Sequence, residues 1–213
     1  MTDVAVVTGA SSGLGFEIAA LLKQRGLDVV GVARRGPDIK GDASRRETAV
    51  EALNESRRRG TLKLLVNCAG IGVFHPAGTY TAGEIEQVIN SNLVAMITFC
   101  DGFLSTIRES GGTIVNVMST AALVGKPNET VYCAAKWGAR GYTEALRAEA
   151  KGTRILAVYP GGMRTPFWSG DPQRAGKFMD PKEIAGAIVD AVFRPGIAVT
   201  ELVINRPPAA GGN

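Results

Sequence analysis

The sequence predicts an α/β fold, a doubly wound parallel sheet of the Rossmann type with about seven strands and helices on both faces. Short β-branched runs alternate with longer helical patterns, which is typical of parallel strands joined by helical crossovers. The first run passes directly into a glycine-rich turn, as the first strand of a nucleotide-binding sheet does. No internal repeat or change of composition divides the chain, so all 213 residues are expected to form a single domain, 1–213.

The first half of the chain opens with an apolar run, Val4–Thr8, typical of a strand buried on both faces. Apolar residues at helical spacing predict a helix over Leu14–Arg25, and Gly26 is a suitable C-terminal stop. The next elements expected are a strand at Asp28–Ala33, a polar helix at Ser44–Arg59 and a strand at Leu62–Asn67.

The second half continues the alternation and ends in a polar tail. The expected elements are helices at Thr81–Leu93 and Val94–Glu109, a strand at Thr113–Met118, a long helix at Thr130–Lys151, a strand at Arg154–Tyr159, a helix from Pro181 to Phe193 and a short strand at Glu201–Asn205. Residues 206–213 are rich in Pro, Ala and Gly, so a flexible tail is expected there.

The composition argues against several classes of protein. The 24 Lys and Arg exceed the 20 Asp and Glu by 4, and the basic segment Arg45–Arg59 has no interleaved aromatic residues, so a nucleic-acid module is not expected. The 3 cysteines form no CxxC pattern, and the 1 histidine, His75, has no supporting motif. A disulfide framework, a metal site and a Ser-His-Asp hydrolase are therefore not expected.

The chain is expected to act in the cytoplasm without a membrane. Its N-terminus (MTDVAVVTGA) lacks a basic leader. No apolar run approaches the roughly 20 residues that a membrane-spanning helix needs.

The glycine-rich turn TGASSGLG is the first candidate binding site. Its spacing is Gly-x3-Gly-x-Gly between a strand and a helix, where backbone amides and the helix dipole favour a phosphate. The residues expected to hold the pyrophosphate of a dinucleotide are Gly9, Ser11, Ser12, Gly13, Leu14 and Gly15. A plain glycine-rich turn is the alternative.

The end of the second strand bears on the choice of cofactor. A carboxylate there would accept hydrogen bonds from the ribose of NAD, whereas an arginine can pair with the 2′-phosphate of NADP. The chain has Arg34 and Arg35 at this point and no carboxylate. NADP(H) is therefore the preferred cofactor and NAD(H) a possible one; the alternative is that both arginines are simply solvated.

At this point the chain resembles the short-chain dehydrogenase/reductase family, in its compact single-domain branch, over nearly its whole length. TGASSGLG is similar to the family's TGxxxGxG, NCAG to NNAG with Cys68 replacing the second Asn, YCAAK to YxxxK, and PGGMRT to PGxxxT. Asn92 matches the family's structural and catalytic Asn, and Ser119 follows the strand TIVNVM. The resemblance implies cofactor contacts from Asp42, Ala43, Asn67, Ala69, Gly70, Tyr132, Lys136, Pro160, Gly161, Met163 and Thr165.

The resemblance also implies hydride transfer between a nicotinamide and a carbonyl or alcohol carbon, with Asn92, Ser119, Tyr132 and Lys136 as the catalytic set. Tyr132 would be the general acid or base, Ser119 would hold the substrate oxygen, and Asn92 would anchor a water linked to Lys136. Residues at i and i+4 share a helix face, so Lys136 can favour the phenolate of Tyr132. Lowering a phenol pKa from about 10 to 7 needs about 4 kcal/mol, more than one screened lysine supplies. The charge of the oxidised nicotinamide is expected to add to it.

The substrate pocket is expected to be apolar. The residues that flank the motifs are Phe74, Ala121, Gly162, Phe167 and Trp168. They favour a neutral, fairly hydrophobic ketone or aldehyde, although the aromatic side chains could instead pack the loop without touching a ligand. Arg164 is the only obvious anchor for an anion, and residues 165–180 could form a mobile lid.

The leading hypothesis is an NADPH-dependent carbonyl reductase. The alternatives are an NAD-linked alcohol dehydrogenase of the same family and a dinucleotide-binding sensor without catalysis, which should have lost Tyr132 or Lys136. The family pairs its subunits through the two long helices, so a homodimer or homotetramer is expected.

Overall fold

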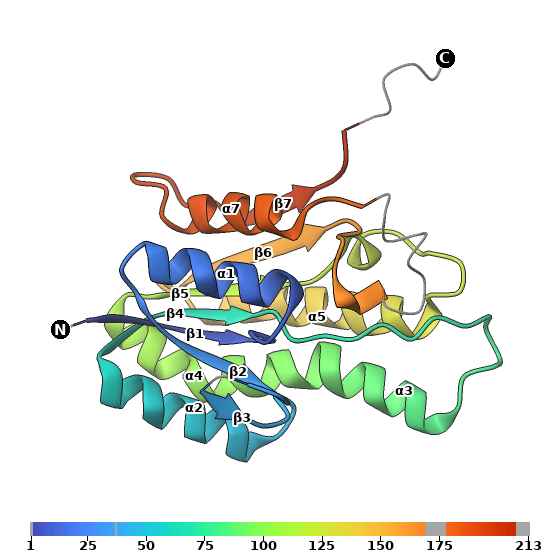
Figure 1. Cartoon of the computed structure of the whole chain (residues 1–213), viewed down its shortest axis with the longest axis horizontal. Coiled ribbons are helices and arrows are strands. Elements are labelled where there is room, and N and C mark those ends of the chain that lie inside the picture. The colour runs from blue at the N-terminus through green and yellow to red at the C-terminus, as the bar shows by residue number, and fades with distance from the viewer. Residues whose placement is uncertain (1, 37, 169–177, 208–213) are drawn as a thin grey trace.

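The computed structural model describes residues 2–36, 38–168 and 178–207. Its centre is one parallel sheet of seven strands in the order β3-β2-β1-β4-β5-β6-β7 (Figure 1). The strands are β1 (Asp3–Thr8), β2 (Asp28–Ala33), β3 (Ile39–Lys40), β4 (Thr61–Asn67), β5 (Thr113–Val117), β6 (Arg154–Pro160) and β7 (Glu201–Ile204). The predicted doubly wound fold is confirmed. Only β3 had no sequence signal, because two residues show no periodicity.

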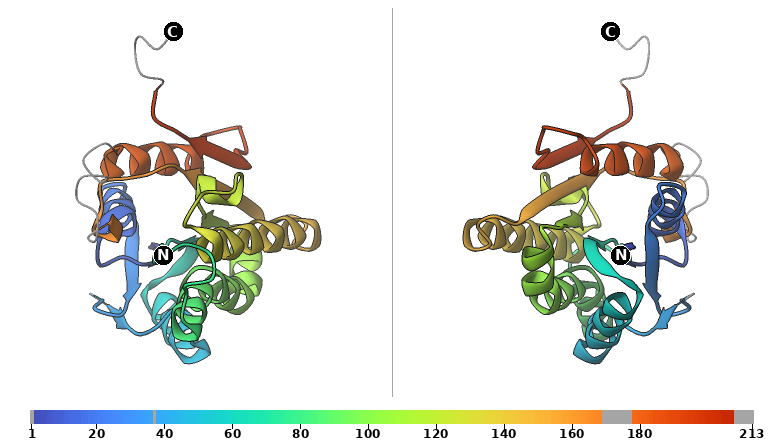
Figure 2. Two further views of the ribbon diagram at one scale, coloured as in Figure 1. Left: turned by 90° about the vertical axis from the view of Figure 1, so that its right-hand side faces the viewer. Right: turned by 90° about the vertical axis from the view of Figure 1, so that its left-hand side faces the viewer.

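Helices cover both faces of the sheet, as Figure 2 shows. The main helices are α1 (Gly13–Gln24), α2 (Arg46–Arg59), α3 (Ala82–Ile89), α4 (Ala95–Ser110), α5 (Thr130–Glu149) and α7 (Pro181–Val192). Buried residues of α1 and α7 form one core with the sheet, and buried residues of α2, α4 and α5 form another on the opposite face.

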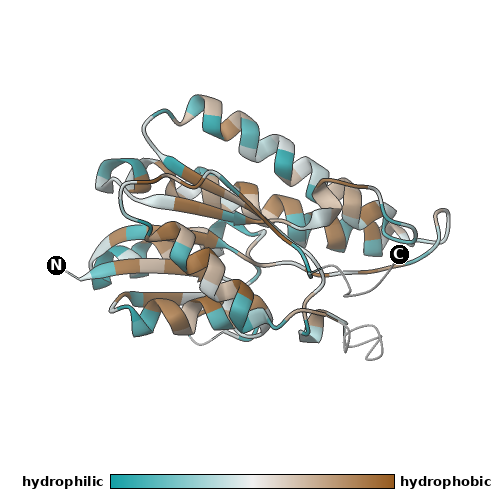
Figure 3. Ribbon diagram, turned by 90° about the horizontal axis from the view of Figure 1, so that it is seen from above, coloured by the Kyte–Doolittle hydropathy of each residue, from teal (hydrophilic) through white to brown (hydrophobic). Residues whose placement is uncertain are grey.

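The two cores follow from the alternation of side chains along each strand. In β1, Val4 and Val6 pack into the core beneath α2, α4 and α5, whereas Ala5 and Val7 pack beneath α1 and α7. All four side chains are fully buried. The strands are therefore almost continuously apolar, as the brown colouring in Figure 3 shows, and this is the pattern of a parallel sheet covered on both sides.

The helices α3 and α4 form one continuous rod rather than the two separate helices expected at Thr81–Leu93 and Val94–Glu109. A π-helical turn, Asn90–Val94, joins them without a break, and no Gly or Pro stands at the junction to end the first helix. The wider turn carries Asn92, which is buried. By length and composition the rod Ala82–Ser110 could cross a membrane, but buried core helices meet the same criterion, and Phe99, Phe103 and Ile107 pack against the sheet.

The strand order reverses between β1 and β4, and this switch point places a cleft at the carboxyl ends of the strands. Thr8 Oγ1, at the end of β1, accepts hydrogen bonds of 3.0 Å from the backbone N–H groups of both Cys68 and Ala69. The glycine loop and the segment after β4 are thereby fixed side by side. Most of the expected lid, 165–180, and most of the expected tail, 206–213, lie outside the described residues.

Candidate active site

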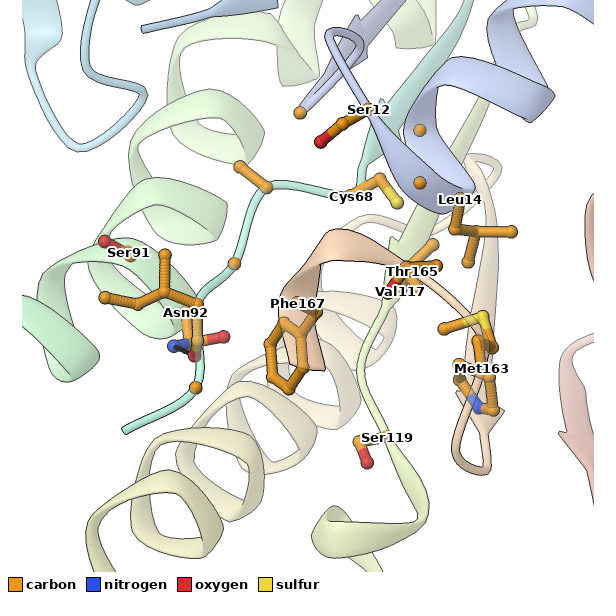
Figure 4. Close-up of a pocket in the computed structure, with 18 of the residues that line it drawn as sticks. Ser12, Leu14, Cys68, Ser91, Asn92, Val117, Ser119, Met163, Thr165 and Phe167 are labelled. Carbon is orange, nitrogen blue, oxygen red and sulfur yellow. Dashed lines mark hydrogen bonds between the residues drawn. The ribbon is translucent and has the colours of Figure 1, made fainter. Parts of the chain in front are cut away.

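One cavity of about 1070 Å³ lies at the carboxyl ends of β1, β2, β4, β5 and β6. Figure 4 shows Phe167 near its middle, between the segments that carry Asn92 and Met163. Most of the residues predicted as site residues line this cavity: Gly9, Ser11, Ser12, Gly13, Leu14, Gly15, Arg34, Asp42, Ala43, Ala69, Gly70, Asn92, Ser119, Tyr132, Lys136, Pro160, Gly161, Gly162, Met163, Thr165, Phe167 and Trp168.

Three predicted site residues do not line the cavity. Asn67 points into the core between the sheet and α4, where its amide donates to Asn116 Oδ1 on the neighbouring strand at 2.8 Å and to Cys100 Sγ on α4 at 3.2 Å. Ala121 is fully buried in a short 3₁₀ turn, Thr120–Ala122. Phe74 forms a second layer behind the cavity wall, with its ring against those of Tyr132, Phe167 and Trp168.

The glycine loop has the geometry that its sequence predicts. Gly9 has a φ of 72°, and a Cβ atom there would lie 2.9 Å from the carbonyl oxygen of Cys68. A Cβ atom on Gly15 would lie 2.4 Å from the carbonyl oxygen of Gly9, too close for any side chain. Ser12 is the N-cap of α1 and makes no side-chain capping bond. The helix therefore presents its first N–H groups and its positive dipole end to the cavity.

Arg34, Arg35 and Asp42 lie together at one end of the cavity. Asp42 Oδ1 accepts hydrogen bonds from the backbone N–H and the hydroxyl of Ser44 at 2.9 and 2.8 Å. Burial acts to raise the pKa of Asp42, but these hydrogen bonds and the charge of Arg34 outweigh it and hold the pKa below its usual value. This end of the cavity thus has both cationic and anionic groups.

Tyr132 lies in the first turns of α5, and its side chain is only 7% exposed. Burial raises its pKa well above the ordinary value of a phenol; a hydrogen bond with Ser119 acts in the opposite direction but is the weaker effect. The expectation that the protein would lower this pKa towards neutral is therefore not met by the chain alone. Desolvation is the largest effect on this pKa, because a phenolate is costly in a site that excludes water, and the charge of Glu129 raises the pKa further.

Lys136 follows one turn later on the same face of α5, so the i and i+4 positions share the cavity as expected. Its ammonium donates a long hydrogen bond of 3.5 Å to the carbonyl oxygen of Val117 and lies 5.6 Å from the centre of the Tyr132 ring. Burial lowers the pKa of Lys136 to about 8. The lysine is thus poised to change its charge near physiological pH.

Asn92 faces the same space from the π-helical turn. Its amide nitrogen donates to the carbonyl oxygens of Ile71 and Val88 at 2.8 and 2.9 Å, which fixes the orientation of the side chain. Its Oδ1 atom is buried and has no partner among the described residues. A Cβ atom on Gly70 would lie 2.6 Å from Asn92 Oδ1 and 3.6 Å from Lys136 Nζ. The space left open by Gly70 therefore borders both polar groups.

An aromatic cluster of Phe74, Phe167 and Trp168 lies against the Tyr132 ring. The rings of Phe74 and Trp168 stack with centroids 5.0 Å apart and an interplanar angle of 17°. Phe167 places its ring edge-on to Tyr132, with centroids 5.7 Å apart. Gly72 makes room for this cluster, since a Cβ atom there would lie 2.4 Å from Phe74 and 2.6 Å from Phe167. The wall next to the phenol is thus apolar and aromatic.

Several lining residues were not predicted, among them Lys126, Glu129 and Arg206. Lys126 and Glu129 precede Tyr132 by six and three residues. This short separation in sequence from a predicted catalytic residue was the signal that could have indicated them. Arg164, considered as an anion anchor, pairs instead with Asp180 at 3.2 Å and is not among the lining residues. In the described part of the chain, no group of three or more His, Cys, Asp or Glu side chains could hold a metal ion.

The sequence of the chain is similar to known proteins over most of its length. The family model for short chain dehydrogenases matches residues 3–175. The chain is 31% identical to an uncharacterized oxidoreductase of Staphylococcus saprophyticus, over 96% of this chain and 97% of that protein. It is 32% identical to the 3-oxoacyl-[acyl-carrier-protein] reductase of Vibrio harveyi, over 87% and 88% of the two chains.

Solved structures are similar as well. A short-chain dehydrogenase/reductase from Vibrio parahaemolyticus superposes with a TM-score of 0.82 and 29% identity, over 95% of this chain and all of that one. The chain therefore belongs to the short-chain dehydrogenase/reductase family and is an NAD(P)-dependent oxidoreductase.

Proposed function

We propose that the protein is an NADPH-dependent reductase that transfers a hydride to a neutral, fairly hydrophobic ketone or aldehyde, with Tyr132 as the general acid. The observation that supports this most directly is that Ser119, Tyr132 and Lys136 line the same cavity as the glycine loop. The similar protein from Vibrio harveyi is a 3-oxoacyl-[acyl-carrier-protein] reductase. The reverse reaction would use Tyr132 as the base.

The cavity fits a dinucleotide. Gly15 has no side chain and leaves room for a pyrophosphate beside the glycine loop. The start of α1 has no side-chain cap, so its backbone N–H groups can donate to that pyrophosphate. Asp42 and Ala43 would hold the adenine end, and Pro160, Gly161, Met163 and Thr165 would hold the nicotinamide end; all six line the cavity. When bound, the nicotinamide supplies the hydride.

The protein handles the proton. At neutral pH the buried phenol of Tyr132 is protonated, so it can donate a hydrogen bond and then its proton to the oxygen of a carbonyl that is being reduced. The Ser119 hydroxyl, which hydrogen-bonds the phenol, would hold the same oxygen. As the phenol loses its proton, a charged Lys136 would stabilise the phenolate.

Asn92 is proposed to hold a water that links Lys136 to solvent. Its unpartnered Oδ1 atom and the Lys136 ammonium border the space that Gly70 leaves open. A buried carbonyl oxygen without a partner is costly, and a water between two such polar groups would satisfy both. Lys136 could then recover a proton after each turnover without the cavity having to open.

The preference for NADP(H) rests on Arg34, because a guanidinium can pair bidentately with a 2′-phosphate. Replacing Arg34 with Ala should raise the KM for NADPH while leaving the KM for NADH nearly unchanged. A wild-type KM for NADH equal to or below that for NADPH would favour the alternative, an NAD-linked alcohol dehydrogenase. A dinucleotide sensor without catalysis is less well supported, because Tyr132 and Lys136 are both present.

The preference for a hydrophobic carbonyl compound rests on Phe167 and Trp168, which line the cavity, with Phe74 packed behind them. Such a wall binds an apolar substituent by shape and area rather than by hydrogen bonds. The test is to follow NADPH absorbance with aldehydes, diketones, quinones, steroids and 3-oxoacyl thioesters. Turnover of several apolar members supports the proposal, and turnover of none of them contradicts it.

We also propose that the enzyme is a homodimer or homotetramer and that it acts in the cytoplasm. Ala135 and Ala139 on α5 are buried, and a Cβ atom on Gly138 would lie 2.9 Å from Leu93, so these small residues pack within the chain. Ala134, Trp137 and Gly141 form an exposed stripe on the outer face of α5, and the Trp137 side chain is 47% exposed. This stripe is the proposed contact, and light scattering of Trp137→Glu tests it.

A further inference from the structure

Lys126 brings a positive charge to the wall of the cavity that the proposed catalytic pair also lines. It lies in the loop between β5 and α5 and lines the cavity together with Ser119, Thr120 and Tyr132. Its ammonium donates a 2.9 Å hydrogen bond to Thr120 Oγ1. Thr120 follows Ser119 directly in the sequence. The ammonium is therefore hydrogen-bonded to the residue that follows Ser119, whose hydroxyl is proposed to bind the reacting oxygen.

The Lys126 ammonium has N–H donors that its bond to Thr120 does not use. A lysine ammonium carries three N–H donors, and Thr120 accepts one of them. Among the residues that the structure describes, no carboxylate oxygen lies within 4.0 Å of Lys126. Its remaining donors are thus not committed to a salt bridge within that part of the chain, and the side chain lines the cavity in which the carbonyl compound would lie.

Glu129 limits which group of a substrate could meet this ammonium. Its side chain is only 2% exposed and lines the same cavity, three residues after Lys126. Glu129 adds an acidic side chain to the cavity wall that carries Lys126, so a substrate carboxylate placed beside Lys126 would meet an acidic group as well as a positive charge. An uncharged oxygen can accept a hydrogen bond from Lys126 without that repulsion.

We propose that Lys126 is a specificity-determining residue that donates a hydrogen bond to a second, uncharged oxygen of the substrate, close to the carbonyl that is reduced. The preferred substrates would then be neutral 1,2- or 1,3-dicarbonyl compounds or their esters, with their apolar part against the aromatic cluster. This inference rests on the proposed carbonyl reduction and adds the recognition of a second oxygen to it.

The test compares substrates of similar size with and without the second oxygen. We would measure kcat/KM with NADPH for ethyl 3-oxobutanoate and 2-hexanone, and for 2,3-hexanedione and 3-hexanone. Each pair would be measured in the wild type, Lys126→Met, Lys126→Arg and Arg164→Met. The ratio within a pair is compared between variants, so the different intrinsic reactivity of the two substrates cancels. Arg164→Met is the matched control, since it removes a cation that does not line the cavity.

Lys126→Met is expected to lower kcat/KM for the dicarbonyl member of each pair by roughly 10- to 100-fold, the range for a hydrogen bond to a charged group. The monoketone member should change by less than about 3-fold, Lys126→Arg should recover most of the loss, and Arg164→Met should leave both members unchanged. Free 3-oxobutanoate should be a poorer substrate than its ester in the wild type.

Equal losses on both members of a pair would overturn the proposal, because they would show that Lys126 only holds the loop through Thr120. No loss on either member would overturn it as well. A wild type that reduces monoketones but is unaffected by Lys126→Met refutes this inference and leaves the proposed function standing. A wild type that reduces none of the four carbonyl compounds contradicts the proposed function itself.

Discussion

Lys136 Nζ lies 5.6 Å from the centre of the Tyr132 ring, one helical turn along α5, with both side chains buried. In the chain alone, burial disfavours the charged form of both groups. It raises the pKa of the phenol and lowers that of the ammonium to about 8. The pair is therefore suited to donating a proton from a neutral phenol, which is what reduction of a carbonyl requires.

The lowered pKa of Lys136 predicts a pH-dependent cost to folding. An unfolded lysine has a pKa of about 10.4, so the folded state binds fewer protons than the unfolded state between about pH 8 and 10.4. The cost of keeping Lys136 charged in the folded state is present in full below pH 8. The free energy of unfolding then increases as the pH rises through that window. At 1.36 kcal/mol per pKa unit, the cost at pH 7 is about 3 kcal/mol.

The variant Lys136→Met separates the contribution of Lys136 to the free energy of unfolding from that of other buried groups that titrate at high pH. It should be more stable than the wild type at pH 7, and the difference in the free energy of unfolding should shrink between pH 8 and 10.4. Urea denaturation of both proteins across this range measures it. A difference that stays constant with pH would contradict the lowered pKa.

Gly15→Ala should weaken cofactor binding and the fold together. The new Cβ atom would lie 2.4 Å from the carbonyl oxygen of Gly9, so the loop must move. We expect the Kd for NADPH to rise by at least about 10-fold, together with a lower Tm. Gly83→Ala is the control, because a Cβ atom there meets nothing within 4 Å. Unchanged NADPH binding by Gly15→Ala would show that this loop does not hold the cofactor.

Gly70→Ala should slow turnover more than it weakens NADPH binding. Its methyl group would intrude on Asn92 Oδ1, at 2.6 Å, and fill the space that Asn92 shares with Lys136. If a water there returns protons to Lys136, kcat should fall by at least about 10-fold, with a larger solvent isotope effect. Steady-state kinetics in H₂O and D₂O check this, and an unchanged kcat would exclude the proton path.

Phe167→Ala should widen the site. The Phe167 ring packs against Tyr132 and Trp168, so its loss opens the apolar wall next to the phenol. We expect kcat/KM to rise for bulky ketones and to fall for small ones, which lose contact area. Comparing acetophenone derivatives of increasing size measures this. A uniform decrease for all sizes would mean that the ring only supports Tyr132.

The alternation of apolar runs and helical patterns was enough to predict every strand but β3, and the ordered motifs placed most of the cavity residues. The errors have physical causes. Nothing in the sequence around Leu93 shows that a π-helical turn would carry one helix through the predicted boundary. Asn67 is in the right segment, but its amide points into the core beneath α4 and meets Asn116, a pairing that depends on strand order. Lys126 and Glu129 line the cavity because of the course of the loop before α5, in which the Lys126 ammonium donates to Thr120 Oγ1, and no sequence motif indicates that course.

The central claim is that Tyr132 supplies the proton for hydride transfer, and Tyr132→Phe tests it most directly. The aromatic ring and its contacts with Phe74 and Phe167 are retained, and only the hydroxyl is lost. The measurement is single-turnover oxidation of bound NADPH by a carbonyl substrate that the wild type reduces, with NADPH binding followed in parallel by fluorescence. We predict that the variant binds NADPH with nearly wild-type Kd and that hydride transfer is slowed by at least about 100-fold, in the range for loss of a general acid. Wild-type single-turnover rates in Tyr132→Phe would contradict the mechanism.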